Sequence, residues 1–105
     1  MGVYLLREIL MLDLPSGWSF ITNHAHVLFC LARDPEIRMR DVATQVGLTE
    51  RAVQRIVREL AQDGYVSSQR RGRRTVYQIH GAKPLRRAVV HHRHVAELLA
   101  LIQPS

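Results

Sequence analysis

The chain has 105 residues, and 47% of them are hydrophobic, which suits one small globular domain and excludes a disordered chain. Fifteen basic residues against nine acidic ones give a formal net charge of +6. This excess favours a polyanionic partner, either nucleic acid or an acidic membrane surface.

Residues 1–20 are expected to form an apolar extension of the domain. Arg7 and Glu8 interrupt the segment, so it is not expected to span a membrane, and it lacks the cleavage site of a signal peptide. We expect it to contribute to dimerisation through a small apolar set: Tyr4, Leu5, Ile9 and Leu12.

Three helices are predicted in residues 21–62. The first begins at Thr22 or Asn23 and continues to about Arg33, with one apolar face formed by Ile21, Ala25, Leu28 and Ala32. Its single Cys30 is interpreted as a small buried hydrophobe rather than a redox sensor. Because one cysteine cannot form an internal disulfide, a reducing, cytoplasmic location is expected.

A short second helix is expected from Asp41 to Val46, after residues 37–39, which are either an extended piece or the lead-in to it. The third helix follows a Thr49 cap and ends near Gln62. Its inward face is predicted by the spacing of Val53, Ile56, Val57 and Leu60.

A hairpin and a last helix complete the chain. Strand-like residues at 65–69 and 75–80 flank a glycine-containing loop at 70–74, and Thr75, Tyr77 and Ile79 share one face of the second strand. A final helix is predicted from about Leu85 to Ile102, with one apolar stripe that would form a dimer seam: Leu85, Val89, His92, Ala96, Leu99 and Ile102. The expected organisation is therefore an extension at 1–20, a core domain at 21–81 and a dimerisation helix within 82–105.

Three small or apolar residues predict how the second and third helices meet. Ala43 lets the two helices cross closely, Gly47 can adopt the left-handed turn conformation, and Val53 returns the third helix to the core. With the following hairpin, this predicts a mainly α fold with a small β-hairpin wing, a winged helix-turn-helix.

Over roughly residues 23–80 the sequence resembles the MarR-like and ArsR-like winged helix regulators. The resemblance rests on Asp41-Val42-Ala43, Gly47-Leu48-Thr49, the helix from Arg51 to Leu60 and Asp63-Gly64-Tyr65-Val66. It extends through the arginine-rich wing to Val76-Tyr77-Gln78-Ile79. It implies a homodimeric, double-stranded DNA-binding transcriptional regulator. The third helix would enter the major groove, the wing would touch backbone or minor groove, and terminal helices would pair the subunits.

The chemistry of the exposed residues agrees with this implication. Arginine can bond guanine bidentately and glutamine can do the same with adenine. Thr49 is placed at the helix start to hold a phosphate. The predicted DNA-binding residues are Thr49, Arg51, Gln54, Arg55 and Arg58 on the helix, and Arg70, Arg71, Arg73 and Arg74 in the wing. Seven of the fifteen basic residues lie between 51 and 74, where Glu59 and Asp63 are the only acidic ones.

Two other functions are weighed against DNA reading. The first is a winged domain that binds protein, against which the placement of the arginines argues. The second is a metal-responsive repressor, because ArsR-type sensors place histidine ligands on their terminal helix. His91 and His94 could bind zinc across a dimer, but Lys83 stands where another histidine would be expected. We expect no cofactor and no enzymatic activity, because no catalytic triad, phosphate loop or paired carboxylates stand out.

Overall fold

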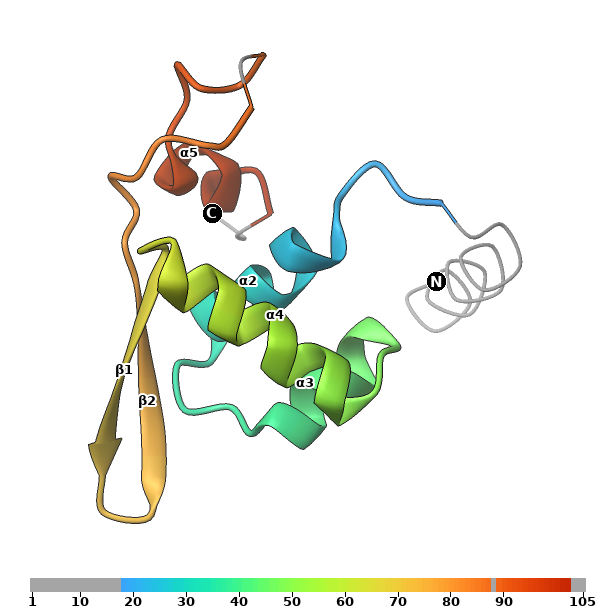
Figure 1. Cartoon of the computed structure of the whole chain (residues 1–105), viewed down its shortest axis with the longest axis vertical. Helices are drawn as coiled ribbons and strands as arrows, with labels where there is room; N and C mark the ends of the chain where they lie inside the picture. Colours follow the sequence, from blue (N-terminus) through green and yellow to red (C-terminus); the bar gives the residue numbers. More distant parts are fainter. Residues whose placement is uncertain (1–17, 88, 103–105) are drawn as a thin grey trace, which may run out of the picture.

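The computed structural model describes residues 18–87 and 89–102, so most of the predicted extension lies outside the described residues. The described elements occur in the order helix, helix, helix, hairpin, helix. Their bounds are α2 Asn23–Arg33, α3 Met39–Val46, α4 Glu50–Gln62, β1 Val66–Arg71, β2 Arg74–Ile79 and α5 Val95–Ala100. The predicted mainly α fold with a β-hairpin wing is confirmed (Figure 1).

Helix α2 lies at the centre of the core, packed against α3, α4 and β2. Thr22 caps it by accepting a hydrogen bond from the backbone N–H of Ala25 at 3.2 Å. Every residue from Val27 to Leu31 is buried, Cys30 included. The single apolar stripe predicted for this helix is therefore too narrow, because partners on several sides bury Val27 and Leu31 as well as Leu28.

The turn between α3 and α4 depends on Gly47, whose φ of 74° is left-handed. In this conformation the N–H groups of Gly47 and Leu48 both donate to the carbonyl oxygen of Ala43, at 2.9 and 3.0 Å. Helix α3 begins at Met39, two residues before the predicted start, and Arg38 caps it without a side-chain hydrogen bond. The preceding piece is therefore the lead-in to α3, and Ile37 within it is buried.

The wing is a two-stranded antiparallel hairpin that extends away from the helices (Figure 1). Its register pairs Val66 with Ile79 at the base and Arg71 with Arg74 at the tip. The turn contains only Gly72 and Arg73, and Gly72 has a φ of 64°, as a two-residue hairpin turn with glycine at its first position requires. The predicted five-residue loop is thus wrong, because this tight turn lets pairing continue through Arg70, Arg71 and Arg74.

The long last helix predicted from Leu85 is also wrong, since α5 begins at Val95. The chain before it forms a loop closed by hydrogen bonds from Leu85 N–H to the Arg93 carbonyl and from Val95 N–H to the Lys83 carbonyl. Arg87 inside this loop has a φ of 82°, which is incompatible with a right-handed helix. The carboxylate of Glu97 fixes the helix start by accepting the N–H of His94 at 2.9 Å.

Because the helix is shorter than predicted, the residues of the predicted dimer seam do not share one helix face. Leu85 and Leu99 pack against the core of their own chain, whereas Val89 is 83% exposed. Within the described residues, no helix is both long and apolar enough to cross a membrane.

Candidate nucleic-acid interface

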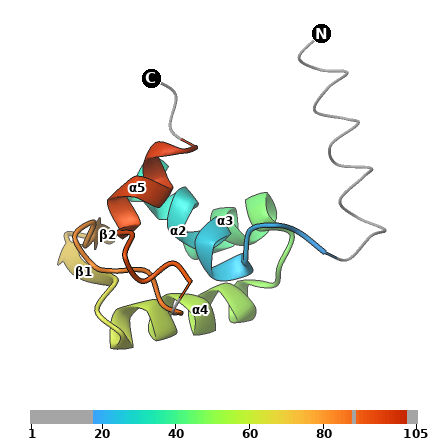
Figure 2. The ribbon, with the colours of Figure 1, turned by 90° about the horizontal axis from the view of Figure 1, so that it is seen from above.

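Helix α4 has one buried apolar side and one exposed polar side. Val53, Ile56 and Leu60 are buried and fix the helix to α2 and α3. The four side chains predicted to read DNA are all exposed on the other side: Arg51, Gln54, Arg55 and Arg58. Figure 2 shows α4 along the lower edge of the domain, with α2, α3 and α5 above it in this view.

Thr49 serves first as the cap of α4. Its hydroxyl oxygen accepts the N–H of Ala52 at 3.1 Å, which satisfies one of the unpaired amides at the helix start. The hydroxyl hydrogen remains available to donate, because the cap uses the oxygen as acceptor. Thr49 is exposed, so an anion at the start of α4 could receive that hydrogen bond.

The exposed arginines of α4 differ in whether a carboxylate lies near them. Arg55 Nη1 lies 3.5 Å from Glu59 Oε2, one helical turn further along. Glu59 Oε1 in turn contacts His24 Nε2 on α2 at 2.7 Å. The hydrogen bond from His24 is the largest cause of the lowered pKa of Glu59; desolvation, the second in size, opposes it, and the charge of Arg55 adds a smaller lowering. Among the described residues, no ion pair involves Arg51 or Arg58.

The wing arginines form a second basic group at the end of the hairpin. Arg70, Arg71, Arg73 and Arg74 are all exposed. Arg70 Nη1 lies 3.5 Å from Thr75 Oγ1, and Arg74 Nε lies 4.0 Å from Glu36 Oε1. No ion pair of the described residues includes Arg71 or Arg73, so these two guanidiniums keep their full hydrogen-bonding capacity. The predicted residues therefore fall into two groups, one on α4 and one on the wing.

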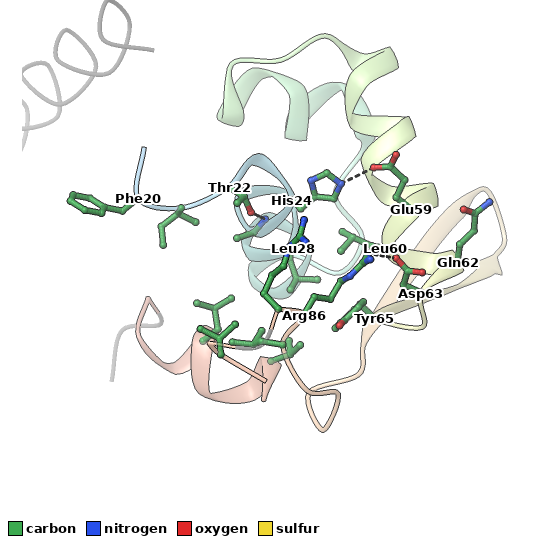
Figure 3. A pocket seen from close by; sticks show the side chains of 17 residues that line it. Phe20, Thr22, His24, Leu28, Glu59, Leu60, Gln62, Asp63, Tyr65 and Arg86 are labelled. Carbon is green, nitrogen blue, oxygen red and sulfur yellow. Dashed lines mark hydrogen bonds and ion pairs between the residues drawn. The ribbon is translucent and has the colours of Figure 1, made fainter. Parts of the chain in front are cut away.

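A cleft that the sequence did not reveal lies beside the end of α4 (Figure 3). Its volume is about 750 Å³, and α2, α4, the loop before α5 and α5 itself all contribute to its lining. Leu28 and Leu60 give it an apolar wall, while the His24–Glu59 hydrogen bond and the Arg86–Asp63 ion pair, the latter at 2.6 Å, give it two polar contacts. No short motif could predict this cleft, because its residues come from four separate segments.

The histidines near α5 do not share the helix on which the zinc hypothesis relied. His94 precedes the first residue of α5, and His91 lies in the loop before it. Glu97, the nearest acidic group, already binds the His94 backbone N–H and Arg93 Nη1. No group of three or more histidine, cysteine, aspartate or glutamate residues could hold a metal ion within the described part of the chain.

A family model described as winged helix-turn-helix DNA-binding matches residues 23–67. Among curated proteins no significant match was found. One similar solved structure is the PcaV transcriptional regulator from Streptomyces coelicolor in complex with its natural ligand, at 23% identity and a TM-score of 0.49. The match covers 74% of this chain and 59% of the PcaV chain, so this chain spans less than two thirds of that protein.

The matched residues include α2, α3, the glycine turn and α4, and they end as β1 begins. The hairpin that follows α4 supplies the wing of this fold. The predicted winged helix-turn-helix fold is therefore confirmed. Residues 23–67 thus match a winged helix-turn-helix DNA-binding model, and the hairpin that follows completes the order of elements of that fold.

Proposed function

We propose that this protein is a sequence-specific, double-stranded DNA-binding transcriptional regulator. Helix α4 reads base edges in the major groove, and the wing contacts the backbone or the minor groove. The observation that carries this proposal is the exposure of three arginines and a glutamine on α4, opposite a side in which Val53 and Ile56 are almost fully buried. A rigid helix with exposed guanidiniums has the geometry and the donors that guanine recognition needs.

A protein-interaction role for the same domain is the alternative. It gives no reason for two separate groups of exposed arginines, one on α4 and one on the wing, of which only Arg55, Arg70 and Arg74 lie near a side-chain partner among the described residues. Phosphate contacts account for both groups, because each neutralised phosphate releases counterions and adds affinity.

The proposal is tested by selecting bound duplexes from random DNA with the full chain. We expect a defined site for the wild-type protein, and no enrichment for a triple variant, R51A/Q54A/R55A, that remains folded. A control variant, R86A/R93A, removes the same number of positive charges near α5 and should select the wild-type site. Equal enrichment by the triple variant and the wild type would refute base reading by α4.

The regulator is further proposed to act as a homodimer. Large apolar side chains stay exposed at both ends of the described chain, including Phe20 at 90% and Leu101 at 81%. Residues 1–20 and 82–105 are the segments proposed to cover them in a second copy. A two-fold dimer would bind half-sites about one helical turn of DNA apart. Sedimentation at micromolar concentration should give a dimer, and a monomer at that concentration would contradict it.

A further inference from the structure

Glu59 occupies a position between α4 and α2 that the DNA-reading role does not require. It lies one turn beyond Arg55 on the same helix, and its side chain is partly exposed rather than buried. Each carboxylate oxygen has its own partner: Oε1 contacts His24 Nε2 at 2.7 Å, and Oε2 lies 3.5 Å from Arg55 Nη1. Glu59 thus connects a residue of α2 to one of the predicted base readers.

The two contacts differ in how firmly they hold. The His24 contact is short and joins two separate helices, and His24 itself sits in the first turn of α2, which the Thr22 cap fixes. The Arg55 contact is longer and joins two residues of one helix. The hydrogen bond to His24 on α2 therefore fixes the position of the Glu59 carboxylate. The carboxylate in turn restrains the guanidinium of Arg55.

A restrained arginine differs from a free one in DNA recognition. A guanidinium must present two parallel donors to guanine O6 and N7, and holding the long side chain beforehand reduces the rotamer freedom lost on binding. A carboxylate beside it also repels DNA phosphates, which lowers affinity for every sequence alike. A glutamate at this position would therefore lower the affinity for DNA of any sequence and increase the discrimination between bases.

We propose that Glu59, anchored by His24, is a positioning residue that sets the base preference of Arg55. This inference rests on the proposed function, since it assumes that Arg55 contacts a base. Both His24 and Glu59 also line the cleft, so the pair that orients Arg55 is accessible from that side of the domain (Figure 3). Arg51 and Arg58, which lack such a pair among the described residues, would not depend on Glu59.

The test uses the full chain and the site selected by the wild-type protein. Discrimination is the ratio of Kd values for a single-base mismatch and for the matched duplex, measured at each base pair. R55A first identifies the base pair that Arg55 reads. E59Q should then lower discrimination at that base pair by about threefold to tenfold, while affinity for unrelated DNA rises. Loss of discrimination with a gain in affinity is a result that simple destabilisation would not give.

Three further variants sharpen the test. In the R55A background, E59Q should change discrimination no further, because the side chain it positions is gone. H24A should lower discrimination in the same direction as E59Q, since it removes the anchor. The matched control is E50Q, which removes the same charge from the exposed first turn of α4 and should leave discrimination at the Arg55 base pair unchanged.

Two results would overturn the inference, and they are distinguishable. If R55A lowers discrimination but E59Q does not, Glu59 does not position Arg55, although base reading by α4 stands. If R55A leaves discrimination intact at every base pair, both the inference and the assignment of Arg55 as a base reader fail. Thermal unfolding of each variant, recorded in parallel, verifies that the binding data come from folded protein.

Discussion

Helix α4 and the wing carry similar numbers of exposed arginines but support them differently. The arginines of α4 project from a helix whose opposite side is locked in the core by Val53 and Ile56, each at most 1% exposed. The wing is held by Val66 at the start of β1 and by half-buried residues of β2, including Tyr77 and Ile79, whereas the remaining residues of β1 are exposed. A helix held in place by the core suits the reading of base edges, whereas charges on an exposed hairpin suit contacts with the DNA backbone.

The largest expected effect concerns the support of α4. Ile56→Ala removes a buried side chain from the core and should lower the free energy of unfolding by about 2–5 kcal/mol. Gln69→Ala, on the exposed part of β1, should change it by less than about 0.5 kcal/mol. Chemical denaturation measures both values. Equal stability losses would mean that the core holds the wing as firmly as it holds α4.

The next effect separates base reading from charge. Loss of one bidentate contact should reduce discrimination by about 1–3 kcal/mol at one base pair. We therefore expect R51A to lose preference at a single position of the selected site, as measured by competition with mismatched duplexes. Arg73→Ala in the wing removes the same charge and should leave every mismatch ratio as in the wild type.

The wing should instead determine how binding depends on salt. The double variant R71A/R73A removes two exposed guanidiniums that no described acidic residue pairs with. If each neutralises one phosphate, the slope of log Kd against log salt concentration should fall by about 0.9 for each. Fluorescence anisotropy at several salt concentrations gives the slope. An unchanged slope would show that the wing does not touch the backbone.

The smallest effect is on acid stability. The pKa of Glu59 on α4 is lowered, mainly by its hydrogen bond with His24. Among the described residues, no wing side chain has a carboxyl group with a lowered pKa. A lowered carboxyl pKa contributes stability above the ordinary carboxyl range, and this stability is lost as pH falls through the lowered pKa. E59Q should flatten the pH dependence of unfolding below about pH 4.5. An unaltered acid limb would show that the His24 contact adds no stability.

The sequence was sufficient to predict the regions whose structure depends on local signals. The turn at Gly47 and the faces of α4 were predicted because glycine freedom and helical periodicity act over a few residues. The nine predicted DNA-binding residues are all exposed, and their contact with DNA stays a prediction. The tight turn at Gly72 was predicted as a longer loop. The strand residues next to it are arginines, so they lack the apolar alternation by which a strand is recognised in a sequence.

The C-terminal region shows what periodicity cannot detect. Leu85, Val89 and Leu99 fit a helical stripe, yet α5 begins only at Val95. The start is set by the hydrogen bond between Glu97 and the His94 amide and by backbone contacts of the loop with Lys83. Partners distant in the sequence, such as Lys83 and Val95, leave no repeating signal, and the cleft and the contact between His24 and Glu59 were missed for the same reason.

The most direct test of base reading by α4 uses guanine N7, an acceptor exposed in the major groove. Guanines of the selected site are methylated at N7, and the methylated positions that block binding are mapped for the wild type and for R51A/Q54A/R55A. We predict interference at defined guanines for the wild type and none at those guanines for the triple variant. Wild-type binding that tolerates N7 methylation throughout the site would contradict the assignment of α4 to the major groove.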